Sequence, residues 1–246
     1  FNGCCFADLD LKQQGVIEDF QLLFYIIQPP TPERVKYDIF DRVNRGGTPL
    51  NKQEMRNALY RGRCTRMLDK LCCSPEFLIA TGRSINKERM KDQYVVLRAM
   101  AFLMLHRGEF KDIPALQYRG DIDDFLARFM VYVNDNAPEK LIVDYENLFI
   151  RCMQISYDLL GENGFRFSGN GIRRPINMPL FEALSYLFSF VPEKIDYTWA
   201  SRLILDIESV KEEFDDSRYF SGNIDSTTSV SFRFDRMDKI INRIQL

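Results

Sequence analysis

Two helices separated by a pair of glycines are the feature of this 246-residue chain that most constrains its fold. Val35, Ile39 and Val43 recur at four-residue spacing and predict a first helix with one apolar face. Gly46 and Gly47 predict its end, because a residue just past a helix often needs a positive φ that glycine reaches without a Cβ penalty. The chain must therefore turn sharply at the glycine pair before it continues.

A second helix is predicted to begin directly after this turn. Asn51 is a good N-cap, and Glu54 is placed three residues later to complete a capping box. The two helix ends should then form a polar corner, whose side chains are Arg42, Asn44, Arg45, Thr48, Asn51, Gln53, Arg56 and Asn57.

Backbone N–H groups freed at the glycine pair and at the start of the second helix can hold an anion, which the helix dipole also favours. Arg42, Arg45 and Arg56 suit phosphate in particular, because a planar guanidinium donates two hydrogen bonds at once. The alternative is that Asn44, Asn51 and Arg56 only cap helices and bridge two domains.

The net charge of −2 conceals a local asymmetry. Residues 41–66 carry seven bases and two acids, and residues 193–216 carry eight acids and three bases. A basic patch of this kind is typical of a surface for phosphate or for an acidic partner, although a solvated helix face has the same pattern.

A second cationic stretch is the glycine-rich loop 165–174, which either contacts DNA or docks against the helices. The candidate DNA contacts are Arg61, Arg63, Arg66, Arg166, Arg173 and Arg174.

Composition narrows the protein class. An apolar content of 46% with 28% charged residues is ordinary for a folded domain. No apolar run approaches the roughly 20 residues that span a bilayer, so we expect no membrane partner. The six cysteines include two adjacent pairs and no C-x-x-C spacing, which favours reduced, packed thiols in a cytoplasmic protein.

The rest of the chain is predicted to be mainly helical. Residues 20–27 are the exception, because aromatic and β-branched residues before two prolines are typical of a buried strand. One strand cannot form a sheet, so its partners are expected upstream of Phe1, in a longer protein. Helices are predicted at 9–19, 74 onward, 87–106, 121–134, 138–160, 179–190, 198–213 and 232–244.

Catalytic patterns are not found. His106 is the only histidine, and its place near a helix end indicates a surface or capping residue rather than a catalytic one. Adjacent acids on a helix point about 100° apart and do not converge by spacing alone. The pairs 123–124, 212–213 and 215–216 are therefore interpreted as solvated charge. Arg89, Asp92 and Arg98 suggest either a buried Arg–Asp tie between helices or a ligand site.

Several segments resemble the domain-of-unknown-function 262 family, which includes the N-terminal module of GmrSD-type, modification-dependent restriction enzymes. The core of the resemblance is Ile39-Phe-Asp-Arg-Val-Asn-Arg-Gly-Gly-Thr-Pro-Leu-Asn-x-Gln-Glu-Met-Arg-Asn-Ala-Leu-Tyr-x-Gly62. Further segments are 6–9 with 17–19, 89–92 with 97–98, 176–177 with 180–184, and 229–235. The family's other hallmark, Asp-Gly-Gln-Gln-Arg in a module related to ParB and sulfiredoxin, does not occur in this sequence.

The resemblance implies a mainly α fold, a helical bundle (63–246) attached to the remnant of a small ParB/sulfiredoxin-like α/β unit (1–62). It implies that Arg42, Asn44, Gly46 and Gly47 help to bind nucleotide or nucleic-acid phosphate. The full candidate set for phosphate is Arg42, Asn44, Arg45, Gly46, Gly47, Asn51 and Arg56. Expected partners are DNA and a nuclease domain or subunit. No catalytic residue, metal ligand or cofactor is expected in this chain, whereas a nucleoside triphosphate and a divalent metal would serve the full-length protein. The alternative function is a non-enzymatic helical interaction module.

Overall fold

The computed structural model describes residues 3–24, 26, 28, 31, 33–44, 49–169, 173–192, 194, 196–220 and 222–244. Within them the chain is mainly α-helical, and no β-strand is formed. The chain divides into two compact units, residues 1–46 (unit 1) and residues 47–246 (unit 2). The predicted mainly α class is confirmed.

Unit 1 contains a short 3-10 helix, η1 (Phe6–Asp8), and two α-helices, α1 (Leu11–Glu18) and α2 (Glu33–Asn44). Asp10 caps α1, since its side chain accepts from the Gln13 N–H at 2.8 Å. The apolar residues predicted to share a face of α2 are helical, and Val35, Ile39 and Val43 are all exposed.

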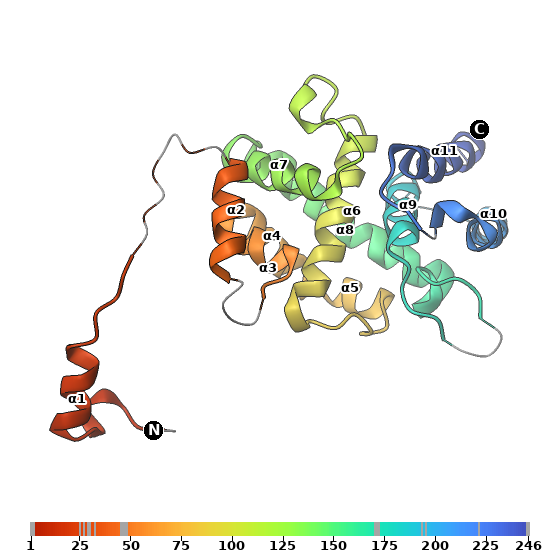
Figure 1. The fold of residues 1–246 in the computed structure, drawn as a ribbon. Coiled ribbons are helices and arrows are strands. Elements are labelled where there is room, and N and C mark those ends of the chain that lie inside the picture. The colour runs from red at the N-terminus through yellow and green to blue at the C-terminus, as the bar shows by residue number, and fades with distance from the viewer. Residues whose placement is uncertain are drawn as a thin grey trace. The chain divides into compact units, whose positions relative to one another are not determined.

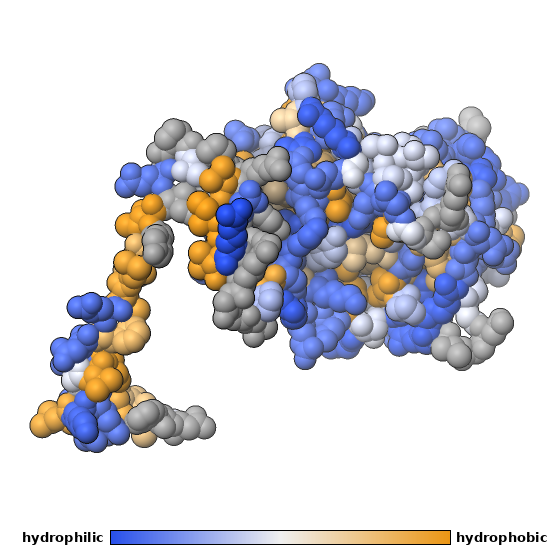
Figure 2. All heavy atoms as spheres, in the orientation of Figure 1, coloured by the Kyte–Doolittle hydropathy of each residue, from blue (hydrophilic) through white to orange (hydrophobic). Residues whose placement is uncertain are grey.

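The structure does not show the buried strand predicted over 20–27. Its described residues, 20–24 and 26, form neither strand nor helix, and the large apolar side chains among them are 67% to 80% exposed. Figure 2 shows apolar side chains gathered along this stretch between α1 and α2. The physical reason is that a strand requires a hydrogen-bonded neighbour, and the described residues contain no other strand.

Unit 2 is built from nine α-helices among its described residues, joined by 3-10 turns. In chain order these elements are α3 (Lys52–Leu59), α4 (Arg63–Cys72), α5 (Pro75–Ala80), η2 (Glu88–Met90), α6 (Lys91–His106), η3 (Pro114–Leu116), α7 (Ile122–Asp135), α8 (Glu139–Leu160), η4 (Gly161–Asn163), α9 (Met178–Phe188), α10 (Tyr197–Asp216), η5 (Arg218–Phe220) and α11 (Thr227–Ile244).

Helix α6 runs through the middle of unit 2 (Figure 1). It packs against α4, α7, α8 and α9, and α11 packs against α9. Every residue from 95 to 104 is buried, so α6 has no solvent-facing side over this length. A helix that is buried on all sides over such a length belongs in the core of the unit. The surrounding helices α7 and α8 keep the one-sided pattern expected of outer helices.

Helix boundaries mostly follow the predicted signals. Ser74 caps α5, Asp121 caps α7, and α8 ends at Gly161, whose φ of 61° a residue with a Cβ adopts with strain. The last helix begins at Thr227 rather than at 232. Its first turn is rich in Ser and Thr, which favour turns as well as helix starts, and the Ser226 hydroxyl accepts from the Ser229 N–H at 3.1 Å.

A network of buried charges joins α6, α9 and α11. The Glu182 carboxylate is fully buried between two guanidiniums, accepting from Arg98 Nε and, at 2.7 Å, from Arg233 Nη2. Arg98 also donates to Asp225 at 2.6 Å, and Arg233 donates to the Ile224 carbonyl at 2.7 Å. Burial by itself would lower the pKa of Arg98, but Glu182 and Asp225 raise it well above its usual value. Of the two alternatives that the sequence left open for Arg98, the structure shows the buried tie, and its partners are Glu182 and Asp225.

The six cysteines are free thiols. Cys64, Cys72 and Cys152 are buried, and burial raises the pKa of all three thiols, that of Cys152 to about 12. Cys4, Cys5 and Cys73 are exposed, so the prediction of packed thiols holds for half of them. None of the helices that the structure describes has the length and apolar composition needed to cross a membrane.

His106 is packed rather than placed on the surface, which corrects the expectation from sequence. Its ring stacks on Phe234 with centroids 3.6 Å apart, and its Nε2 atom is buried with no hydrogen-bond partner among the described residues. Burial, together with the charge of Arg233, lowers the pKa of His106 to about 3.

Removing the shared carboxylate should be costly. Glu182→Ala leaves Arg98 and Arg233 buried without their common partner, and we expect the free energy of unfolding to fall by about 3–5 kcal/mol. Urea unfolding followed by circular dichroism measures it. Glu212→Ala, at an exposed position of α10, is the matched control and should stay within about 0.5 kcal/mol of wild type. Equal losses for both variants would contradict the role of the network.

Acid should destabilise the fold through His106. Because its pKa is lower in the folded than in the unfolded chain, the unfolded state binds the extra proton below pH 6.5, and stability falls as the pH drops from 6.5 toward 3. Between pH 7 and pH 5 this one group should cost about 2 kcal/mol. Urea unfolding at pH 7 and at pH 5 measures this effect. Between the two pH values, the free energy of unfolding of His106→Phe should fall by about 2 kcal/mol less than that of wild type. An unchanged pH dependence would sink the prediction.

Candidate functional site

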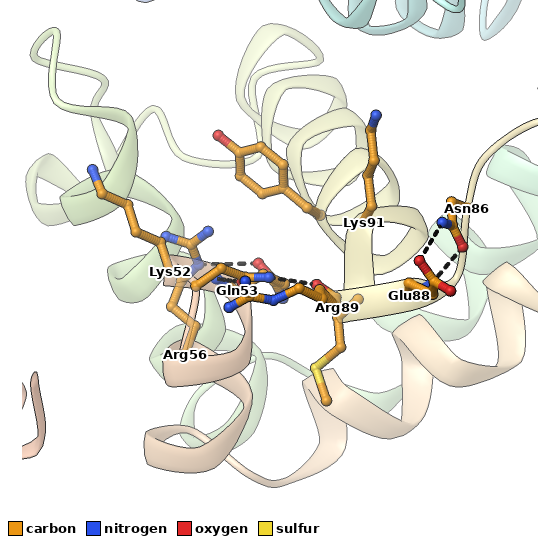
Figure 3. Close-up of a pocket in the computed structure, with 10 residues that line it drawn as sticks. Lys52, Gln53, Arg56, Asn86, Glu88, Arg89 and Lys91 are labelled. Atoms are coloured by element: carbon orange, nitrogen blue, oxygen red, sulfur yellow. Dashed lines mark hydrogen bonds between the residues drawn. The ribbon is translucent and has the colours of Figure 1, made fainter. Parts of the chain in front are cut away.

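A pocket of about 480 Å³ lies in unit 2, where the start of α3 meets the start of α6 (Figure 3). Four cations and one carboxylate are among the residues that line it. Lys52 and Lys91 extend from its opposite sides, one from α3 and one from α6. The lining residues are Asn51, Lys52, Gln53, Arg56, Asn86, Glu88, Arg89, Met90, Lys91 and Tyr94.

The start of α3 is a complete capping box, as predicted. The Asn51 side chain accepts from the N–H groups of Gln53 at 2.8 Å and Glu54 at 2.9 Å, and the Glu54 carboxylate accepts from the Asn51 N–H at 2.6 Å. The N–H groups of Gln53 and Glu54, two of the backbone donors expected to hold an anion at the start of this helix, are therefore already engaged.

Two consecutive residues before α6 have left-handed backbone conformations. Arg89 has φ 56° and Met90 has φ 58°, which costs energy for residues with a Cβ. Contacts with α3 hold this strained turn in place. Asn51 Nδ2 donates to the Arg89 carbonyl at 2.7 Å, and Arg89 Nη2 donates to the Pro49 carbonyl at 2.6 Å and to Glu54 at 2.9 Å. The bond from Arg89, followed by that from the Asn51 N–H, lowers the pKa of Glu54.

The N-terminus of α6 opens on the pocket. Its N-cap position is Met90, whose side chain makes no capping hydrogen bond. The partial positive charge of this 16-residue helix is added to that of Lys91, the first residue of α6, and Asp92 in the first turn offsets part of it by accepting from the Gln93 N–H at 2.8 Å. Lys91 is exposed, and its ammonium has no hydrogen bond or ion pair within the described part of the chain.

Arg56 is the buried cation of the site, with 1% of its surface exposed. Its Nε donates to Gln53 Oε1 at 3.1 Å and its Nη1 to Asp123 at 2.8 Å. Its guanidinium lies 5.3 Å from the centre of the Tyr94 ring. Its Nη2 is buried and has no hydrogen-bond partner among the described residues. A buried guanidinium nitrogen without an acceptor is costly, so this atom marks a place where an acceptor would be stabilising.

Asp123 comes from α7 and completes the site from outside the pocket. It accepts from Arg56 and from Lys52 Nζ. Burial acts to raise the pKa of Asp123, but the bonds from Lys52 and Arg56 outweigh it and lower the pKa. One carboxylate therefore accepts from two cations of the site. The interpretation of Asp123 as solvated charge is wrong.

The sequence candidates for phosphate binding are distributed over both units. Asn51 and Arg56 line the pocket. Arg42 is exposed on α2 in unit 1, and Asn44 is the last residue of that helix. Arg45, Gly46 and Gly47 lie outside the described residues, and the placement of unit 1 against the pocket is not defined. The roles of Arg42, Asn44, Arg45, Gly46 and Gly47 stay predictions.

The candidate DNA contacts have varied surroundings. Arg61 and Arg66 are exposed, and Arg63 donates to the Ala137 carbonyl at 2.8 Å. Arg173 and Arg174 pair with Glu162 and Asp215. Arg166 is buried and donates to Glu162, Thr81 and Arg174 carbonyls and to the Ser84 hydroxyl. Arg166 thus holds the loop against the helices, which is the docking alternative that the sequence left open.

Sequence reasoning missed most of the pocket. Lys52 and Arg56 share a helix face at four-residue spacing, which was a usable signal. Arg89, Lys91 and Tyr94 lie 30 to 45 residues away in sequence, and no spacing rule links them to α3. Among the described residues, no group of three or more His, Cys, Asp and Glu side chains is placed to hold a metal ion.

Comparison of the chain with protein-family models, with curated proteins and with solved structures finds no match. The resemblance to the domain-of-unknown-function 262 family therefore stands on the quoted sequence segments alone.

The capping box should matter for stability as well as for the pocket. Asn51→Ala removes the acceptor for two backbone N–H groups and the donor to Arg89, so we expect a loss of about 1 kcal/mol in the free energy of unfolding. Urea unfolding measures it. Asn51→Asp, which keeps the acceptor, should retain most of the stability, and an equal loss in both variants would contradict the capping role.

Proposed function

We propose that the pocket between α3 and α6 binds a phosphate group of a nucleotide or a nucleic acid. The observation that carries this proposal is Arg56 Nη2, a buried nitrogen with no acceptor among the described residues, on a guanidinium that belongs to a pocket lined by cations. Charge-assisted bonds from guanidinium to phosphate oxygens are among the strongest hydrogen bonds in proteins.

Three further features support an anionic ligand. Lys91 has no partner within the described residues, and the N-terminus of α6 contributes its dipole. Lys52 and Arg56 lie close enough together that both pair with Asp123, which places two cations side by side at the pocket. The volume of about 480 Å³ lies within the range of small-molecule sites, and Met90 and Tyr94 supply apolar surface beside the cations. A phosphate attached to an organic group fits this combination better than a bare inorganic ion.

The wider role follows from the resemblance. In this proposal the chain is part of a cytoplasmic restriction or anti-phage defence protein, in which a helical bundle is attached to a small α/β unit related to ParB and sulfiredoxin. The bundle engages nucleotide or DNA phosphate and does not itself catalyse a reaction. DNA and a nuclease domain or subunit are its proposed partners, and a nucleoside triphosphate with a divalent metal serves the full-length protein.

A second candidate function is a non-enzymatic interaction module. It is favoured by the exposed apolar side chains of residues 20–24 and 26 in unit 1 and by Leu205, 71% exposed on α10 of unit 2. Apolar side chains of this size are candidates for contact with a partner protein. The two functions differ in salt dependence, because phosphate binding weakens steeply as salt rises and an apolar interface does not.

Lys91→Ala tests the proposed function without disturbing the core. We expect it to weaken binding of a labelled oligothymidylate, ATP or both by about fivefold to tenfold, with a shallower salt dependence between about 50 and 200 mM. Fluorescence anisotropy measures the oligonucleotide, and calorimetry measures ATP. The matched control is Lys140→Ala, at an exposed lysine outside the pocket.

The two probes separate nucleic acid from free nucleotide as the source of the phosphate. Wild-type protein that binds neither probe at low salt, or equal effects of Lys91→Ala and Lys140→Ala, would overturn the proposed function.

A further inference from the structure

Arg56 stands at the end of a chain of side-chain hydrogen bonds that crosses from α3 to α6 and α4. Arg56 Nε donates to Gln53 Oε1 at 3.1 Å, and Gln53 Nε2 donates to Asn57 Oδ1 at 2.8 Å. Asn57 Nδ2 donates to Gln93 Oε1, and Gln93 Nε2 donates to Asp69 Oδ1 at 2.7 Å. Three amides are therefore aligned in one direction between a guanidinium and a carboxylate.

The direction of this series of hydrogen bonds is set by the groups at its two ends. A guanidinium can only donate and an ionised carboxylate can only accept, whereas each amide can face either way. With Asp69 at one end, every amide oxygen must point toward Arg56 and every amide nitrogen toward Asp69. Gln53 Oε1 is thereby fixed as an acceptor for Arg56 Nε.

This acceptor decides how the guanidinium of Arg56 is held. Gln53 accepts from Nε and Asp123 accepts from Nη1, so the group is fixed on two sides, and Nη2 is left as the donor with no partner in the part of the chain that the structure describes. We propose that Asp69 is a positioning residue of the phosphate site: through Gln93, Asn57 and Gln53 it holds Arg56 so that Nη2 serves the pocket. This inference rests on the proposed function, and it adds a residue on α4 that does not line the pocket.

Asp69→Lys inverts the end of the chain. A lysine can only donate, so Gln93, Asn57 and Gln53 turn in succession, and Gln53 Nε2 then faces Arg56 Nε as donor against donor. Asp69 is exposed on α4, and lysine is a good helix former, so the fold should be retained. The new positive charge would by itself strengthen the binding of an anion. A weaker affinity for the anion would therefore indicate that Arg56 is no longer held in position, because the changed electrostatic field alone would act in the opposite direction.

The experiment measures affinity for ATP and for the labelled oligothymidylate in Asp69→Lys, Asp69→Asn and Gln93→Leu. Asp69→Lys and Gln93→Leu should each weaken binding by about tenfold, the low end of what outer-shell partners contribute at metal sites. Asp69→Asn keeps an oxygen acceptor for Gln93 and should remain within about twofold of wild type. Affinity in Asp69→Lys equal to or tighter than wild type would overturn the inference.

A second readout needs no ligand. The Nε–Hε resonance of Arg56, assigned by its loss in Arg56→Lys, should shift in Asp69→Lys and stay unchanged in Asp69→Asn. A resonance that does not respond to Asp69→Lys overturns the positioning role regardless of binding. A resonance that responds in a protein that binds neither probe supports the hydrogen-bonded chain and overturns the proposed function instead.

Discussion

The carboxylate of Glu182 is the constraint on which the structure of unit 2 depends. It is fully buried on α9 and bonded to Arg98 of α6 and Arg233 of α11. A buried charge is tolerated only when its partners are in place, so the three helices must meet in one register. Apolar packing around α6 supplies most of the burial, but apolar contacts allow neighbouring helices to slide relative to one another. The paired charges require one alignment of α6, α9 and α11.

The same network reaches the candidate site through one aromatic ring. Arg98 Nη1 donates to the Tyr94 hydroxyl at 3.1 Å, and the guanidiniums of Arg98 and Arg56 lie 5.6 Å and 5.3 Å from the ring centre. Tyr94 is one turn before Arg98 on α6 and lines the pocket. The wall of the pocket is thus continuous with the most rigidly paired charges of the core. Contacts of this kind hold pocket side chains in defined rotamers.

Local signals were sufficient for much of the helical framework. The Asn51–Glu54 capping box was predicted by residue, and the helix limits predicted at 74, 121 and 160 coincide with the Ser74 cap, the Asp121 cap and the end of α8 before Gly161. All of these signals act within a few residues. The described residues of the predicted strand, 20–24 and 26, form no strand, because strand structure depends on a partner that the local sequence does not contain. The early start of α11 was missed because Ser and Thr favour both turns and helix N-termini.

In the candidate site, too, local interactions could be predicted and long-range ones could not. The sequence by itself determined that Asn51 and Arg56 lie near the start of a capped helix in a basic stretch, since helical spacing and capping are local. Only the tertiary structure decided that Arg89 and Lys91 face that helix, that Asp123 binds Arg56, and that Glu182 joins Arg98 to Arg233. The physical reason is that charge pairing and pocket shape arise between segments far apart in the chain, where no periodicity of the sequence relates one residue to another.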